Sequence, residues 1–260
     1  MRKMNILILM SLIAGVLPLG SAMAQTDGAE GLPTRVADRP LTLPERTLRA
    51  EVDAGVSHLR IFDADINVAQ MRLGAAYGIT DDIEVGATIA PMTLGILDSE
   101  LRYGDPSIRA RYRFMNGDVE MAAEVEATIP VQDDAESDDL AIRVPVRFHA
   151  DRVRVDTGLE TRLEFGDDIE ARLRVPVEGR LNITDELHVG LHSGLALESL
   201  ENAGDNWRIP LASSVGYTID GEAVTTDIGV AFELPAFVAN GEIETGVWTA
   251  MLNANLHFDL

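Results

Sequence analysis

The sequence predicts an all-β protein, a closed antiparallel up-and-down transmembrane β-barrel of about 12 strands. In the last nine residues, 252–260, apolar side chains occupy the even positions and polar ones the odd positions. The same period of two recurs in almost every segment upstream, and it places the two kinds of side chain on opposite faces of each strand. With aromatic residues at only 5% of the chain, too little apolar surplus remains for a separate core. We therefore expect a sheet that closes on itself through its last and first strands, with lipid outside and a polar lumen inside.

The N-terminus predicts a secretory signal peptide over residues 1–24. Arg2 and Lys3 precede an apolar run at 6–19, and Ala22-Met23-Ala24 supplies the small residues of a cleavage site. The alternative, a transmembrane anchor, is disfavoured because the run is shorter than the ~20 apolar residues that a helical span needs. Residues 25–45 lack periodicity and are interpreted as a loose periplasmic N-terminal leader, and residues 46–260 as the outer-membrane barrel.

Polar turns divide the barrel domain into strands. Turns such as Thr80-Asp81-Asp82 and Asp220-Gly221-Glu222 follow every second strand, whereas most other connections are longer, among them an expected loop at 92–105. Since short turns belong on the periplasmic side, both termini are expected in the periplasm. The first two strands are expected within 48–79, and the others at 83–89, 108–114, 119–129, 140–148, 153–165, 169–183, 187–197, 207–219, 224–234 and 244–260.

Two groups of aromatic residues have outward parity, and each gathers at one end of the strands. This arrangement is typical of the aromatic belts at the two interfaces of a membrane barrel. The group beside the short turns is Tyr77, Phe114, Phe148, Tyr217 and Phe258, and the other group is Phe165, Trp207, Phe232 and Trp248.

Three prolines favour a different architecture. Pro145, Pro176 and Pro210 fall inside expected strands, where each removes a donor from the hydrogen-bond ladder. A β-sandwich with these prolines on edge strands is the alternative fold. Within a barrel their parity is inward, so local bulges solvated by lumen water would accommodate them.

Charge and cysteine content exclude several classes of protein. The chain holds 43 acidic and 21 basic residues, and its net charge of −22 argues against nucleic acid as a partner. It has no cysteine, so neither a lipoprotein anchor nor a disulfide framework is possible. Every basic residue after Lys3 is arginine, whose planar fork pairs with carboxylates better than lysine does.

Rows of arginine and carboxylate lie on the inward face of the strands. In one hairpin, a four-residue turn at 115–118 would place Arg113 opposite Glu120 and Arg109 opposite Glu124. One interpretation is a constriction that selects polar or ionic solutes, so that neutralising Arg109, Arg111 and Arg113 would shift ion selectivity. The other is a network that fills the barrel, because about 12 strands is between the filled small barrels and the open large ones. The residues expected to line the narrowest part are Arg109, Arg111, Arg113, Glu120, Glu124, Arg143, Arg147, Glu160, Arg162, Arg172 and Arg174.

No catalytic residue, metal site or cofactor is expected, and the chain is not predicted to be an enzyme. A lipid hydrolase of the outer membrane needs a His, a Ser and an orienting group together on the outer face. Four histidines have inward parity, and the outward Ser193 has no outward His at its depth. His188 and His192 are about 13 Å apart along one strand, too far to share one ion, and are interpreted as solvated lumen residues. The inward histidines are His149, His188, His192 and His257.

Two motifs resemble a known family. The hairpin Tyr77-Gly78-Ile79-Thr80-Asp81-Asp82 and the strand of Gly104-Asp105 with the basic stretch 107–114 are similar to those of bacterial outer-membrane barrels labelled as transporters of the meta-pathway of phenol degradation. Residues 39–44 have a similar look. The resemblance covers the first half of the chain after residue 24, and the second half only through alternation and a repeated Thr-Asp turn. It implies an outer-membrane location and passage of small, aromatic molecules. The chain departs from the usual barrel ending on Phe or Trp, since it ends on Leu260.

The expected function is an outer-membrane pore for passive passage of small solutes, in a monomer or weak oligomer. Expected partners are outer-membrane lipid, small-molecule solutes and the barrel-assembly machinery, which would engage the C-terminal strand. The alternative is a non-conducting structural barrel whose acidic loops bind lipid headgroup cations or a partner. These acidic residues lie at 133–139 and 167–170 and at Glu198, Glu201 and Asp205.

Overall fold

The computed structural model describes residues 32–61, 64–95, 101–131, 138–166, 168–200 and 206–260. The predicted signal peptide and the start of the predicted leader lie outside these ranges. Within the described ranges, no helix is long and apolar enough to cross a bilayer. A short 3₁₀ turn, η2 (Val36–Asp38), precedes the first strand.

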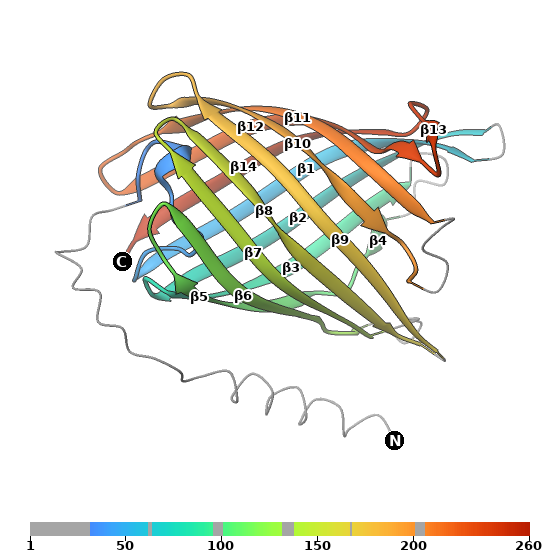
Figure 1. The fold of residues 1–260 in the computed structure, drawn as a ribbon, viewed down its shortest axis with the longest axis horizontal. Coiled ribbons are helices and arrows are strands. Elements are labelled where there is room, and N and C mark those ends of the chain that lie inside the picture. The colour runs from blue at the N-terminus through green and yellow to red at the C-terminus, as the bar shows by residue number, and fades with distance from the viewer. Residues whose placement is uncertain (1–31, 62–63, 96–100, 132–137, 167, 201–205) are drawn as a thin grey trace.

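Twelve long strands form the closed antiparallel barrel that the alternation predicts (Figure 1). Each strand pairs with its neighbours along the chain, and the last strand pairs with the first, from Leu48 opposite Phe258 to Ala54 opposite Leu252. This closure rules out the alternative β-sandwich. The long strands are β1 (Thr47–Ile61), β2 (Ala64–Thr80), β3 (Ile83–Gly95), β5 (Ser107–Met115), β6 (Val119–Thr128), β7 (Asp138–Ala150), β8 (Val153–Phe165), β9 (Ile169–Asn182), β10 (Leu187–Leu197), β11 (Trp207–Ile219), β12 (Val224–Ala239) and β14 (Trp248–Asp259).

Two hairpin extensions correct the predicted boundaries. The expected loop at 92–105 is wrong in part, because β3 continues to Gly95 and pairs with β4 (Leu101–Tyr103). Likewise, β12 continues beyond its expected end at 234 and pairs with β13 (Glu242–Ile243). Each of these short strands pairs with a single neighbour, so neither needs the two-faced alternation that the prediction used.

The side chains are sorted in the reverse of a soluble protein. Large apolar residues point outward and are exposed, among them Val230 at 50% and Leu252 at 51%. The largest fully buried side chains are polar and include Glu84, which is 1% exposed, and Asn182. A soluble monomer exposes apolar patches of only a few hundred Å², whereas this outer face is apolar on every long strand. Such an exterior matches the hydrocarbon layer of a bilayer.

The aromatic residues follow the predicted belts. Phe114, Phe148 and Tyr217 are exposed beside the short turns, and Phe165 and Phe232 are exposed at the opposite end. At that end the rings of Phe232 and Trp248 stack with centroids 6.0 Å apart.

The inward prolines are accommodated differently from the expected bulges. Pro145 lies opposite Gly158, and Pro176 lies opposite Gly194, in both cases without a shift of register. Both glycines have φ of +151°, and a Cβ on either would lie 2.4 Å from the carbonyl oxygen of the residue before the facing proline. The expectation of bulges is therefore wrong for these two prolines. Only at Pro210 does the register shift, between β11 and β12.

We expect Leu252→Arg to destabilise the barrel, because it places a charge near the middle of the outer face of β14. The cost should be about 2–4 kcal/mol in a bilayer, as for arginine at the midplane of other barrels. Equilibrium unfolding in lipid vesicles measures it. Ile243→Arg, on the short strand β13, is the control and should cost much less. Equal costs at the two positions would contradict a lipid-facing β14.

Candidate functional site

Residues 33–46, here called the luminal segment, lie inside the barrel at the end with the short turns (Figure 1). Within the part of the chain that the structure describes, Val36, Ala37, Leu41 and Leu43 are among the few buried apolar residues. The interpretation of this region as a loose leader is therefore wrong for residues 33–45. The physical reason is that the lumen supplies partners for the backbone of the segment, which a periodicity search does not detect.

Side chains of the barrel wall bind the backbone of the luminal segment on both its donors and its acceptors. The N–H groups of Leu41 and Leu43 donate to Glu120 and Glu84 at 2.7 and 3.0 Å. Carbonyl oxygens of the segment accept from arginines. Backbone groups that cannot form a ladder are thus satisfied by lumen charges. The acceptor contacts are Arg154 to Val36, Arg147 to Arg39 and Pro40, and Arg111 to Leu41, at 2.6–2.8 Å.

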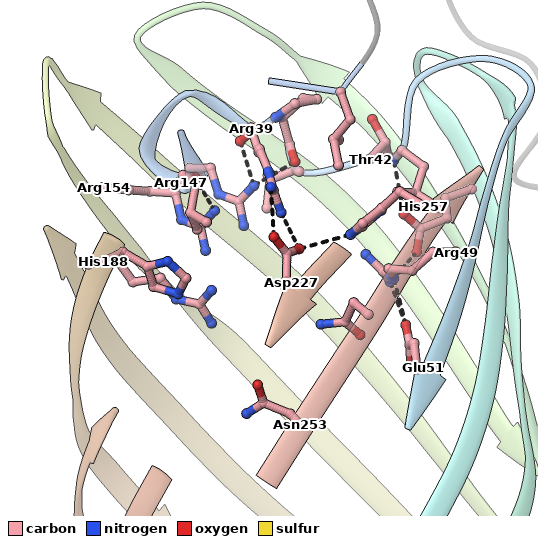
Figure 2. A pocket seen from close by; sticks show the side chains of 18 of the residues that line it. Arg39, Thr42, Arg49, Glu51, Arg147, Arg154, His188, Asp227, Asn253 and His257 are labelled. Carbon is pink, nitrogen blue, oxygen red and sulfur yellow. Dashed lines mark hydrogen bonds and ion pairs between the residues drawn. The ribbon is translucent and has the colours of Figure 1, made fainter. Parts of the chain in front are cut away.

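An ion pair across the lumen anchors the middle of the segment (Figure 2). The Nη atoms of Arg39 donate to both carboxylate oxygens of Asp227, at 2.5 and 2.9 Å. Asp227 also accepts from the Thr218 hydroxyl at 2.8 Å and lies 3.0 Å from His257 Nε2. The Arg39 and Asp227 side chains are about nine-tenths buried, so this pair holds the segment in place only while both partners remain.

The β5–β6 hairpin forms the predicted kind of pairing with one register error. Arg113 does contact Glu120, at 2.8 Å, as expected. The predicted pair of Arg109 with Glu124 is wrong, because Arg109 lies opposite Glu126 and Arg111 lies opposite Glu124, two residues from the expected register. Arg111 forms an ion pair with Glu124. Arg109 instead pairs with Glu51 of β1 and Glu84 of β3, at 3.1 and 3.4 Å.

The remaining predicted lumen residues join the same network, with one exception. Arg143 bridges Glu124, Glu126 and Glu160, and Arg147 pairs with Asp156. Among the described residues Arg174 has no ion pair or hydrogen-bond partner. Nearly every predicted residue is therefore already paired, and several of them hold the luminal segment. The other pairs are Arg162 with Asp139 and Glu160, at 3.5 and 3.9 Å, and Arg172 with Glu164 and Glu198, at 2.9 and 3.7 Å.

Sequence reasoning placed His257 in the lumen but missed two other residues that meet the segment from the far wall, Asp227 and Asn182. Asp227 and His257 have inward parity, and so does Asn182, whose Oδ1 accepts from Ala37 N–H at 2.9 Å. Parity alone could have placed Asp227 and Asn182 in the lumen. Three of the inward histidines are also not simply solvated, because His257 contacts Asp227, His149 contacts Ala37, and His188 is only 9% exposed.

A polar cavity of about 380 Å³ remains between the luminal segment and the barrel wall. Figure 2 shows Arg147, Arg154 and His188 on one side of it and Asn253 on another. Seven arginines line it, against four carboxylates, in a chain whose net charge is −22. The arginines are Arg39, Arg49, Arg72, Arg111, Arg147, Arg154 and Arg180, and the carboxylates are Glu51, Asp53, Glu84 and Asp227.

The other sites considered from the sequence are a lipid-hydrolase site, a metal site and the acidic loops. Ser193 donates its hydroxyl to the Pro210 carbonyl, and His58 contacts Asn67 and stacks on Trp248. No group of three metal-ligating side chains occurs among the described residues. Much of the predicted acidic loops, including 132–137, 167 and 201–205, lies outside them.

Comparisons with known proteins show the fold. No family model matches the chain, and no curated protein matches it in sequence. An outer-membrane channel from Pseudomonas putida F1 superposes with a TM-score of 0.59 at 13% identity, over 90% of this chain and 100% of that one. The NanC porin gives 0.54 at 11%, over 81% and 100%. The translocator domain of the autotransporter NalP from Neisseria meningitidis gives 0.50 at 10%, over 99% and 95%.

We expect Asp227→Ala to release the luminal segment, because it leaves Arg39 buried without its carboxylate. The free energy needed to release the segment from the wall should fall by about 3 kcal/mol. Hydrogen exchange at the Leu41 and Leu43 amides should therefore become about a hundredfold faster. Asp53→Ala is the control, because its partner Arg72 is 56% exposed at the side chain. Unchanged exchange in Asp227→Ala, or an equal change in both variants, would refute the anchoring role.

Proposed function

We propose that this protein is an outer-membrane channel through which small solutes pass without chemical conversion. The observation that carries the proposal is the inverted barrel: an apolar exterior around a lumen whose walls are charged and polar. Water and polar solutes enter such an interior readily, whereas a structural protein has no need for a solvated centre. The shared fold with an outer-membrane channel and with the NanC porin supports the same reading.

The luminal segment narrows the channel at the end with the short turns. There the backbone of the segment is bound by Arg111, Arg147, Glu120 and Glu84. These side chains therefore affect the width of the passage in two ways, because they line it and because they hold the segment within it. Farther along the lumen, Arg143, Glu160, Arg162, Arg172 and Arg174 line the wall and act on solutes directly. Arg174, which lies opposite Glu160, has no side-chain ion pair or hydrogen bond among the described residues and is available to a passing anion.

The proposed location and partners follow from this function. Residues 1–24 are a signal peptide, the short turns and the luminal segment face the periplasm, and the barrel-assembly machinery engages β14. Outer-membrane lipid covers the apolar face. The resemblance to the meta-pathway barrels adds small aromatic molecules to the candidate solutes.

A second candidate is a non-conducting structural barrel whose acidic loops bind lipid headgroup cations or a partner. The luminal segment favours it, because a folded segment crosses the lumen and is bonded to the walls on several sides. The two candidates differ in whether ions pass the segment while it is in place.

Planar-bilayer recordings distinguish the two candidates. We expect stepwise conductance from the refolded protein and a larger step after deletion of residues 33–44, because the deletion widens the narrowest part. Shortening the 240–245 hairpin is the control and should leave the step unchanged. Steps only after the deletion would support the closed barrel. Absence of steps from both folded proteins would refute the channel.

A further inference from the structure

We propose that the lumen cavity binds the carboxylate group of a small organic monoanion, held by Arg154, Arg180 and His188. This inference names the class of solute that the proposed channel would carry. It depends on the proposed channel function only in that the solute must reach the cavity through the lumen. It is carried by three observations: two opposed arginines, a buried histidine without a hydrogen-bond partner at one nitrogen, and an uncharged wall beside them.

Arg154 and Arg180 lie directly opposite each other on β8 and β9. Like charges in this position repel each other, since opposed Cβ atoms are about 5 Å apart. Arg154 is only 5% exposed, so water screens the repulsion poorly. An anion between the two guanidinium groups would relieve it.

The carboxylates nearby leave a surplus of one positive charge. Arg154 and Arg147 share Asp156, at 2.9 and 2.5 Å, and Arg180 pairs with Glu178 at 2.7 Å. Three arginines thus face two carboxylates. The Arg39 charge is already balanced by Asp227 and adds nothing to the surplus.

His188 lines the same cavity and is nine-tenths buried. Its Nδ1 is buried without a hydrogen-bond partner. Unpaired buried polar atoms are rare, so this nitrogen marks the ring as one that lacks its usual partner. The ring is positioned by Gly216, since a Cβ there would lie 2.4 Å from His188 Nε2.

The wall from β10 to β14 leaves room for the organic part of the anion. Between its ends, most inward side chains of this wall are small and uncharged, and two of them, Asn253 and Asn255, line the cavity. The side-chain amides of Asn253 and Asn255 have no hydrogen-bond partner among the described residues and can bind a polar substituent. The volume of about 380 Å³ falls in the ~300–1,000 Å³ range of small-molecule sites. The small or uncharged inward residues are Gly190, His192, Gly194, Ala196, Ala212, Ser214, Gly216, Gly229, Ala231, Asn253 and Asn255.

The charge balance favours a carboxylate over a phosphate. A carboxylate brings one negative charge, which equals the local surplus, and its planar oxygens match the fork of arginine. Inorganic phosphate is partly a dianion at neutral pH, and its second charge would face Asp156 and Glu178. The site therefore discriminates by charge as well as by shape.

The test uses propionate and inorganic phosphate as probes of the full-length refolded protein. Propionate should reduce chloride conductance in a saturable way, and phosphate should do so more weakly. Arg180→Gln should raise the apparent Kd of propionate about tenfold or more, and Arg180→Lys should have an intermediate effect because it keeps the charge without the fork. Arg208→Gln is the matched control, since Arg208 is a paired lumen arginine outside the cavity. A heat-modifiability gel shows that each variant is folded.

A second measurement separates this proposal from the channel itself. Propionate should shift the NMR signals of the His188 ring in isotope-labelled protein, and Arg180→Gln should abolish the shift. This readout needs no conductance, so a silent bilayer with an intact shift would refute the channel and support the site. Equal propionate affinity in Arg180→Gln and Arg208→Gln, phosphate binding as strong as propionate binding, or no shift at His188 would overturn the proposal.

Discussion

The pairing of β14 with β1 is the constraint on which the rest of the structure depends. In hydrocarbon an unpaired row of N–H and C=O groups has no water to bind, so a spanning sheet must have no open edge. The register from Leu48 opposite Phe258 to Ala54 opposite Leu252 provides this closure. It also decides which residues share the lumen, because a slip by one residue would turn Arg49, Glu51 and Asp53 of β1 outward.

Closure leaves the barrel without an apolar core, and the charged lumen stabilises the interior instead. A ring of strands with mostly polar inward side chains has no apolar core, so its interior is stabilised by ion pairs and by the luminal segment. The segment contributes Val36, Leu41 and Leu43 as a small apolar centre, and its backbone takes up lumen charges such as Glu84 that would otherwise be buried with fewer partners. The same groups therefore serve the fold and the passage, and a variant at any of them will affect both.

The sequence predicts the barrel far better than it predicts the site. Alternation with a period of two identifies the long strands, their order and their inward residues, because each strand faces lipid on one side and water on the other. It fails where that requirement is absent, as in the β4 and β13 hairpins. The Arg109–Glu124 pairing fails because Arg109 lies opposite Glu126, two residues from the predicted partner, and no composition signal marks such a difference in register. The luminal segment is missed because the wall binds its backbone groups, which are the same in every sequence. Pro176 is tolerated because a glycine lies opposite it on the neighbouring strand.

The central claim is that neighbouring residues of one strand face lipid and water in turn. The chain has no cysteine, so single spin labels can be placed at positions 250–257 of β14 without background. The account predicts that accessibility to oxygen, which partitions into lipid, peaks at 250, 252, 254 and 256, and that accessibility to a water-soluble nickel complex peaks at 251, 253, 255 and 257. Equal accessibility of neighbouring positions in reconstituted protein would contradict it.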